Sequence, residues 1–323
     1  MEVFMNEILF LQPVLQEKIW GGRQLAQFGY DLPSDKVGEC WGISAHPNGE
    51  SIVKNGSLEG QTLSRVFEEN RDLFGDSKAA EFPLLIKILD AQDDLSVQVH
   101  PDDEYGKEHA GELGKTECWY VIDAKEGAEI IFGHTAKTHE EFNQRIDKKE
   151  WDQLFTRVPV KAGDFFYVKA GTLHAIGSGI LILETQQSSD TTYRVYDYNR
   201  LGDDGLERPL HIQESKDVTM VPNVDGTLAR KEVQVGDSQL TSFGDYDYFS
   251  VEKWDIDGQV AFTKKQPYQL CTVIDGQGSI EINSATDYPL KKGDHFILTS
   301  NCNEWTIIGK LTIISSHPGD LNQ

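Results

Sequence analysis

Long hydrophobic runs are missing from this sequence. None of its 323 residues lies in an apolar stretch that approaches the roughly 20 residues needed to cross a bilayer. Cysteine is scarce as well, and Cys40, Cys118, Cys271 and Cys302 form no CxxC pair, which predicts reduced, mostly buried thiols. The N-terminal stretch carries acidic residues where a secretory signal has basic ones, and Pro13 interrupts it. We therefore expect a cytoplasmic protein.

Positive charge is also in short supply. The sequence has 30 basic and 53 acidic residues, a net charge of −23. Such a field repels nucleic acids and anionic membranes, so we expect neither as a partner. A phosphorylated metabolite would need a local group of basic side chains. No G-x-G-x-x-G or P-loop motif follows a predicted strand, so nothing supports a nucleotide-binding fold.

What the sequence does contain is a succession of short strands. Segments such as FPLLIKILDA at 82–91 and GILILET at 179–185 are rich in Ile and Leu and bounded by Gly, Asp or Pro, a pattern typical of sandwiches and barrels. Helical periodicity is confined to residues near 62–74, 138–155 and 211–220. The first two segments begin with Thr62 and Thr138, which we expect to cap their helices. The fold class predicted is mainly β with a few inserted helices.

The segment SVQVHPDD at 96–103 alternates apolar and polar residues. Val97 and Val99 should point to one face of a strand, and Gln98 and His100 to the other, before Pro101 ends it. Ser96 falls on the same face as Gln98 and His100. This polar face is either solvated or the beginning of a site.

An internal repeat connects two distant parts of the chain. Residues 158–179 and 288–309 align without gaps, and both contain Pro-x-Lys-x-Gly-Asp-x-Phe followed by a strand, a turn and another strand. A repeat of this kind indicates two copies of one supersecondary unit. The Gly-Asp pairs at 163–164 and 293–294 are residues typical of turns between strands.

The first copy resembles the second motif of the cupin superfamily. Gly163, Lys169, Gly171 and His174 have the spacing of that motif, with lysine where proline is usual. The resemblance implies a small jelly-roll barrel that holds a metal at its mouth. In the second copy Glu304 takes the place of His174. The resemblance thus implies two cupin-type barrels: a metal-binding domain at 1–235 and a degenerate domain without a metal site at 236–323.

Four residues are candidate metal ligands in the first barrel: Gln98, His100, Glu117 and His174. Adjacent antiparallel strands can bring such side chains within ligand distance of one ion. Two imidazoles, a carboxylate and an amide oxygen form a donor set that suits zinc, and an open position would mark a catalytic site. The remaining histidines have no comparable context; we expect even His46 and His134 at the surface.

Longer strings narrow the resemblance. QVHPDD, GKTECWY, GTLHA and LETQQSSDTTYRVYD, together with KIWGG and the Trp-x-x-x-x-His-Pro segment at 41–47, are similar to type I mannose-6-phosphate isomerases in their short bacterial form. The resemblance covers essentially the full chain. It implies a zinc-dependent interconversion of mannose 6-phosphate and fructose 6-phosphate through an enediol(ate), with the four metal ligands named above. It also implies that Arg194 and Glu184 are catalytic, and that the substrate is bound by Lys87, Ser96 and Lys115.

Other functions are open at this point. The chain could be a cupin isomerase for another sugar phosphate, or a cupin oxygenase with iron or manganese, although oxygenases favour a facial triad of histidines and a carboxylate. It could instead be a non-catalytic sugar- or metal-binding protein, which the loss of Arg194, Lys87 or Glu184 would favour; all three are present. The partner we expect is a small phosphorylated sugar, and the expected assembly is a monomer or weak homodimer.

Overall fold

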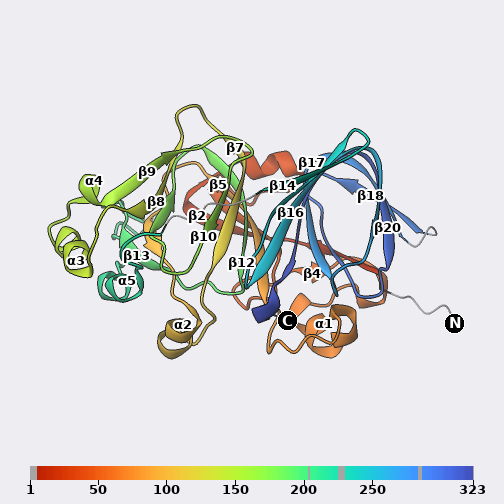
Figure 1. Cartoon of the computed structure of the whole chain (residues 1–323), viewed down its shortest axis with the longest axis horizontal. Coiled ribbons are helices and arrows are strands. Elements are labelled where there is room, and N and C mark those ends of the chain that lie inside the picture. Colours follow the sequence, from red (N-terminus) through yellow and green to blue (C-terminus); the bar gives the residue numbers. More distant parts are fainter. Residues whose placement is uncertain (1–5, 203, 225–229, 283–285, 323) are drawn as a thin grey trace.

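A computed structural model describes residues 6–202, 204–224, 230–282 and 286–322. Strands dominate it, which confirms the predicted fold class. The molecule is elongated, with two β-rich lobes side by side; in Figure 1 helices α2 to α5 lie at the left-hand lobe, and α1 lies below the right-hand one. The cysteines are free and buried, as expected. No helix of the described chain is both long and apolar enough to span a membrane.

Two sheets form the first lobe. The six-stranded sheet has the order β10-β7-β12-β5-β3-β2 and contains β2 (Val14–Gly22), β3 (Val37–Ile43), β5 (Leu84–Ala91), β7 (Glu117–Ala124), β10 (Phe165–Val168) and β12 (Ile180–Gln187). The five-stranded sheet has the order β13-β6-β11-β8-β9 and contains β6 (Val97–Val99), β8 (Glu129–His134), β9 (Phe155–Pro159), β11 (His174–Ile176) and β13 (Tyr193–Tyr196). Trp119 and Ile182 of the first sheet pack with Ile130 and Ile176 of the second in one buried cluster. The lobe is therefore a sandwich.

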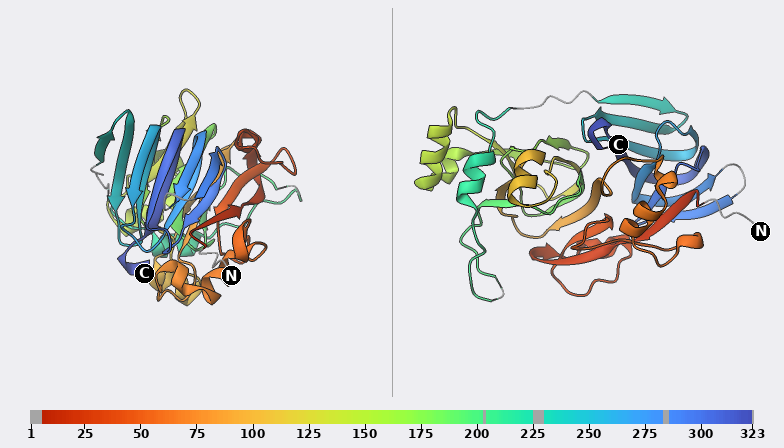
Figure 2. Two further views of the ribbon diagram at one scale, coloured as in Figure 1. Left: turned by 90° about the vertical axis from the view of Figure 1, so that its right-hand side faces the viewer. Right: turned by 90° about the horizontal axis from the view of Figure 1, so that it is seen from below.

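A single nine-stranded sheet forms the second lobe and curls around its own core (Figure 2, left). Its strands are β1 (Ile8–Gln12), β4 (Ile52–Val53), β14 (Lys231–Val235), β15 (Ser238–Asp245), β16 (Phe249–Thr263), β17 (Gln269–Ile282), β18 (Thr286–Lys291), β19 (His295–Leu298) and β20 (Glu304–Pro318). Trp254, Phe296 and Trp305 fill the interior. Because β1 pairs with β19 and with β4, these two N-terminal strands belong to this sheet, whereas β2 and β3 belong to the first lobe.

The internal repeat forms the same turn in both lobes. Gly163 and Gly293 both adopt left-handed backbone conformations, with φ of 87° and 92°. The carboxylate of Asp164 accepts a hydrogen bond from the backbone N–H of Lys161 at 2.9 Å, and Asp294 does the same with Lys291 at 2.8 Å. The strands that follow are β10 and β11 in the first lobe, and β19 and β20 in the second.

The helices are shorter than the sequence predicts. The α-helices are α1 (Leu63–Glu69), α2 (Asp103–His109), α3 (His139–Asp147), α4 (Trp151–Leu154) and α5 (Ile212–Val218), and the 3₁₀ helices are η1 (Gln24–Phe28), η2 (Gly56–Leu58), η3 (Arg71–Phe74) and η4 (Asp320–Asn322). The 62–74 segment breaks at Asn70, which leaves the helical region at φ −135° and ψ 57°. The 138–155 segment breaks before α4, where Lys149 has a φ of 56°.

Only one of the two expected threonine caps forms a capping hydrogen bond. Thr138 accepts a hydrogen bond from the N–H of Glu141; Thr62 does occupy the N-cap position of α1, as expected, but its side chain makes no capping bond. The Thr62 hydroxyl is instead 3.2 Å from the hydroxyl of Ser64. Helix α2 was not expected. It is capped by Asp102, which accepts from the N–H of Tyr105 at 2.9 Å.

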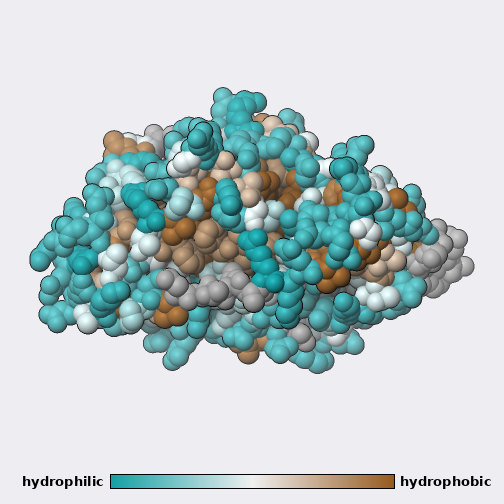
Figure 3. Space-filling view, turned by 45° about the horizontal axis from the view of Figure 1, so that its top comes forward, coloured by the Kyte–Doolittle hydropathy of each residue, from teal (hydrophilic) through white to brown (hydrophobic). Residues whose placement is uncertain are grey.

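The lobes join through an apolar contact. Phe165 of β10 stacks on Phe243 of β15, with ring centroids 4.3 Å apart. Phe67 of α1 and Leu183 of β12 belong to the same buried cluster. The face in Figure 3 is mostly hydrophilic, with hydrophobic side chains gathered toward its middle. The fold thus holds the first sandwich firmly against the second lobe.

Candidate metal centre and substrate cavity

Strand pairing places the polar face of SVQVHPDD inside the first lobe. Strand β11 pairs with β6 so that His174 lies opposite Gln98. Val97 and Val99 are buried in the apolar cluster on the other face. Gln98 lines a cavity, and the ring of His100 lies 4.8 Å from the ring of His174. The predicted alternation is confirmed, and the polar face points into a site and not to solvent.

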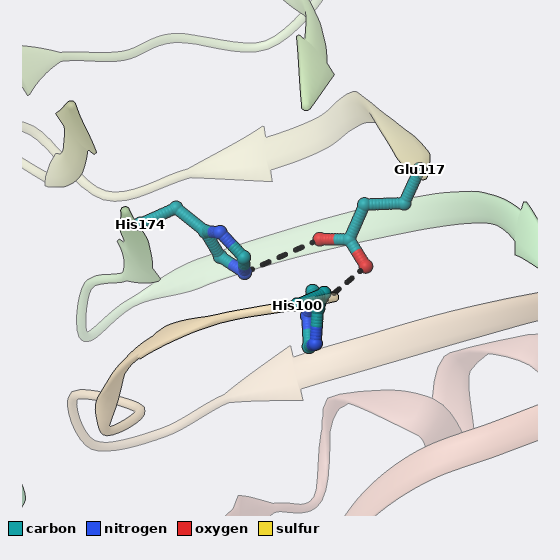
Figure 4. A group of neighbouring side chains, drawn as sticks. All are labelled: His100, Glu117 and His174. Carbon is teal, nitrogen blue, oxygen red and sulfur yellow. Dashed lines mark ion pairs between the residues drawn. The ribbon is translucent and has the colours of Figure 1, made fainter. Parts of the chain in front are cut away.

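Three buried side chains could hold a metal ion: His100, Glu117 and His174. Their ligand atoms all lie within 4.8 Å of one another. Glu117 begins β7, and its two carboxylate oxygens lie 3.5 Å from Nε2 of His100 and 3.5 Å from Nε2 of His174 (Figure 4). In the described part of the chain, this is the one group of three or more such residues.

The two histidines are prepared to act as neutral ligands. Nδ1 of His100 donates to the carbonyl of Thr191 at 2.9 Å, and Nδ1 of His174 donates to the carbonyl of Thr172 at 2.8 Å. This arrangement leaves the Nε2 lone pair of each ring directed at Glu117. Burial lowers the pKa of His174 to about 4 and the pKa of His100 well below its usual value. Neutral imidazoles and a carboxylate fit a divalent metal.

Gln98 lies beside this group. Its amide nitrogen is 3.5 Å from Nε2 of His174, and its amide oxygen accepts from the hydroxyl of Ser96 at 3.3 Å. Ser96 is buried and lines the cavity with Gln98. Because the two ends of an amide are nearly isosteric, a rotation of the group would present its oxygen to the other three residues.

A lysine and two carboxylates adjoin the metal group. Nζ of Lys115 donates to Glu117 at 2.6 Å and lies 3.6 Å from a carboxylate oxygen of Glu184. The indole N–H of Trp119 is 3.0 Å from both carboxylates. Burial and the neighbouring Glu117 raise the pKa of Glu184. Although burial opposes it, Glu117 and Glu184 raise the pKa of Lys115, so this ammonium stays charged.

Lys87 occupies another wall of the cavity with Glu39. The ammonium of Lys87 lies 3.9 Å from a carboxylate oxygen of Glu39, which is also 3.4 Å from Nζ of Lys18. It sits 4.5 Å from the centroid of the Trp41 ring. Burial alone would raise the pKa of Glu39, but Lys87 and Lys18 lower it to about 2. The interruption of an apolar strand by Lys87 is therefore compensated by an ion pair.

Arginines gather at a third wall. Asp197 accepts hydrogen bonds from Arg200 and, through both carboxylate oxygens, from Arg208, with N–O distances of 2.7 Å to Arg208. Burial and the neighbouring Arg208 lower the pKa of Arg194, while Asp197 raises it. Of these groups, Arg194 and Arg208 line the cavity; together with Arg200 and Asp197 they carry a net charge of +2. Arg194 donates to the carbonyl of Pro209, and its buried Nε has no hydrogen-bond partner among the described residues.

These walls enclose a cavity of about 250 Å³. Seven of the sequence-predicted residues line it: Lys87, Ser96, Gln98, Lys115, His174, Glu184 and Arg194. The other two, His100 and Glu117, are buried behind the lining. Residues that the sequence reasoning missed also line it: Lys18, Trp20, Leu89, Leu95, Glu39, Trp119, Ile176, Asp190, Thr192 and Arg208. Lys18, Trp20 and Glu39 lie in the strings KIWGG and GECW. These strings form part of the family resemblance, but it assigned no role to the three residues.

The expectation that His46 and His134 lie at the surface is wrong. Both are buried, with exposed fractions of 5% and 4%. The ring of His46 packs edge-on against Trp41, and Nε2 of His134 lies 3.0 Å from the carbonyl of Met220. The contact of His134 joins segments 86 residues apart, so spacing along the sequence did not reveal it.

Comparisons with known proteins agree with this site. Residues 8–142 match the family model "Phosphomannose isomerase type I, catalytic domain", and residues 239–318 match "Mannose-6-phosphate isomerase, cupin domain". The mannose-6-phosphate isomerase of Streptococcus mutans is 54% identical over 98% of this chain and all of its own length. The mannose-6-phosphate isomerase ManA of Bacillus subtilis is 51% identical over 97% of this chain and 99% of its own length.

Solved structures show the same fold. The crystal structure of a mannose 6-phosphate isomerase from Bacillus subtilis superimposes with a TM-score of 0.94 at 48% identity, covering 96% of this chain and 99% of that one. Mutant structures of phosphomannose isomerase from Salmonella typhimurium reach a TM-score of 0.77 at 16% identity over 97% of this chain, which shows the fold alone. With relatives this similar over nearly its whole length, the chain belongs to the type I mannose-6-phosphate isomerase family.

Proposed function

We propose that the chain is a zinc-dependent aldose–ketose isomerase that interconverts mannose 6-phosphate and fructose 6-phosphate. The observation that carries this proposal is one cavity that joins a set of metal donors to a buried carboxylate of raised pKa and a cluster of arginines. The family match supports the substrate.

His100, Glu117 and His174 would hold the metal, with Gln98 as a fourth ligand through its amide oxygen. Two imidazoles and two oxygens form a borderline donor set, for which we propose zinc. When bound, zinc supplies a Lewis acid that polarises the oxygens at the reacting carbons. The carbonyls of Thr191 and Thr172 keep both histidines in the tautomer that this role requires.

Glu184 is our candidate for the base that moves the proton between adjacent carbons. It lines the cavity, and the raised pKa of its carboxyl brings it closer to neutral pH, where proton transfer in both directions is efficient. One oxygen of Glu184 accepts from Trp119, while the other faces Lys115 at 3.6 Å. The ammonium of Lys115 can stabilise negative charge that develops on the enediolate oxygens.

The arginine cluster is suited to the phosphate. A phosphate ester carries a charge of about −1.5 to −2 at neutral pH, close in magnitude to the +2 of the cluster. Arg194 lies opposite Gln98 in the β13–β6 pairing, and Asp197 follows Tyr196, which lies opposite Val97. At roughly 3.3 Å per residue, Asp197 is roughly 7–10 Å farther along the strand than Arg194. This offset suits a six-carbon substrate with its reacting end at the metal and its phosphate toward Arg208.

Chelation and reconstitution test the proposal. Removal of metal should abolish the isomerisation of mannose 6-phosphate in a coupled assay, and zinc should restore it, with metal analysis of the same sample. We expect His174→Ala to lose metal, and Arg194→Ala to keep metal but lose most turnover. Full activity in the metal-free protein would contradict the metal centre. A zinc-loaded protein that binds the sugar phosphate without turnover would be a binding protein, and preference for another sugar phosphate would reassign the substrate.

The remaining assignments follow from charge and architecture. We propose that the chain works in the cytoplasm, as a monomer or weak homodimer, and that its charge of −23 keeps it from nucleic acids and anionic membranes. We also propose that residues 1–235 carry the chemistry and that residues 236–323 form a supporting domain. Light scattering at several concentrations would measure the assembly.

A further inference from the structure

Three loops meet behind the metal centre, and Glu112 lies where they meet. Glu112 belongs to the loop between α2 and β7. One of its carboxylate oxygens accepts three hydrogen bonds from the loop between β12 and β13: from the hydroxyl of Ser189 at 3.1 Å, the N–H of Asp190 at 3.0 Å and the hydroxyl of Thr191 at 2.8 Å. Although partial burial opposes it, these bonds lower the pKa of Glu112, so it is an anion at neutral pH.

The segment after β3 holds the same group from another side. Nε2 of His46 lies 3.5 Å from the other carboxylate oxygen of Glu112. Nδ1 of His46 accepts from the N–H of Asn48, which places the ring proton on Nε2, facing Glu112. The side-chain amide of Asn48 donates to the carboxylate of Asp190 at 2.9 Å. The Trp-x-x-x-x-His-Pro segment therefore contacts both Glu112 and the loop between β12 and β13, and this is a structural role outside the cavity.

The loop held in this way reaches directly into the site. The carbonyl of Thr191 accepts the hydrogen bond from Nδ1 of His100 at 2.9 Å. The carboxylate of Asp190 lies 4.0 Å from the ammonium of Lys87, and Asp190 and Thr192 line the cavity. The carbonyl that orients a metal-binding histidine is therefore fixed by a carboxylate that touches neither the metal group nor the cavity.

We infer that Glu112 is a positioning residue for the metal centre, acting through Thr191 on His100. A backbone carbonyl on a loop orients an imidazole only as well as the loop itself is held, and Glu112 supplies three of the hydrogen bonds that hold it. Without Glu112 the loop gains freedom, His100 loses a fixed acceptor for its Nδ1 proton, and the site binds metal less tightly. This inference rests on the metal centre of the proposed function.

The test measures zinc affinity of the full chain by competition with a fluorescent chelator. Glu112→Ala should raise the Kd for zinc by about 10-fold or more, the range found when groups that orient metal ligands are removed. Glu112→Gln keeps one acceptor oxygen for the loop and should raise the Kd by less than about 3-fold. Thr191→Val removes one of the three hydrogen bonds, and its Kd for zinc should lie between those of Glu112→Gln and Glu112→Ala. At saturating zinc, kcat of Glu112→Ala should fall by no more than about 3-fold, because the ligands themselves are intact.

Glu108→Ala is the matched control, because Glu108 is an exposed carboxylate on α2 four residues earlier; its Kd should equal that of the wild type. An unchanged Kd in Glu112→Ala, with a wild type that binds zinc, would overturn the inference and leave the proposed function standing. Should Glu112→Ala fail to fold, equal Kd values for Thr191→Val and the wild type would overturn it just as well. A wild type without zinc affinity would overturn the metal centre first, and this inference with it.

Discussion

Protonation of His295 should destabilise the protein in mild acid. His295 begins β19 and is buried where the second lobe meets β3. Its Nε2 lies 2.7 Å from the hydroxyl of Tyr30, and its Nδ1 lies 2.9 Å from the hydroxyl of Thr272. The Tyr30 hydroxyl donates to the carbonyl of Gly293 and so accepts from Nε2–H, which leaves Nδ1 to accept from Thr272. The neutral ring is fully hydrogen-bonded, and no carboxylate pairs with it among the described residues.

Burial lowers the pKa of His295 to about 3 in the folded protein, compared with about 6.5 in an unfolded chain. A group whose folded pKa is depressed contributes full stability above its unfolded pKa and loses it as the pH falls toward its folded pKa. Between pH 7 and pH 5 the unfolded chain takes up this proton and the folded protein does not. The difference lowers the free energy of unfolding by about 2 kcal/mol. This change in the free energy of unfolding is nearly the same for any folded pKa below about 4.

Urea denaturation of the metal-free protein at pH 7 and pH 5 measures this contribution. Wild type should lose about 2 kcal/mol more between the two pH values than His295→Gln, which has no ring to protonate. His139→Gln, which removes an exposed histidine at the start of α3, should behave as wild type does. If His295→Gln lost as much stability as wild type, then His295 would titrate normally in the folded protein and its assigned burial would be wrong.

Three further changes test the cavity and the contact between the lobes. Arg208→Ala should raise the KM for mannose 6-phosphate by about 10–100-fold and change kcat much less, because the proposed phosphate site loses charge-assisted hydrogen bonds; Arg65→Ala, which removes an exposed arginine on α1, is its control, and equal KM values would refute the phosphate assignment. Lys87→Met should lower kcat/KM by about 10-fold or more, since the cavity loses a cation held by Glu39, and unchanged kinetics would make Lys87 structural. Gly42→Ala should lower the free energy of unfolding in urea by about 1–3 kcal/mol, because its Cβ would lie 2.2 Å from the His295 ring; wild-type stability would mean that the lobes separate easily there.

The sequence predicted those parts of the site that depend on local pattern. Period-two alternation placed Gln98 and His100 on one face of β6, and the turn spacing identified His174, because both are fixed within a few residues of backbone. The repeat was recognisable because each Gly-Asp turn requires a left-handed glycine followed by a carboxylate that bonds back to the chain.

The sequence did not predict what depends on contacts between distant segments. Strand β1 joins the sheet of the second lobe by pairing with β19, nearly 290 residues away, and no local pattern specifies that partner. The same reason hid Glu39 and His46, whose partners lie on other loops and strands. Helix α2 is a different case, since Asp102 followed by acidic residues is an ordinary helix start and was predictable from the local pattern.

The charges in the cavity are divided by residue type, and this division fits the proposal that an acidic protein binds an anionic sugar here. Each lysine has a carboxylate within reach: Lys115 has Glu117 and Glu184, Lys87 has Glu39 and Asp190, and Lys18 shares Glu39. These carboxylates offset the positive charge of the lysines. Arg200 and Arg208 share the carboxylate of Asp197, while Arg194 donates to the carbonyl of Pro209, so two positive charges remain on the three arginines. In the function proposed above, the arginines would therefore receive the phosphate, and the sugar would extend toward the metal donors.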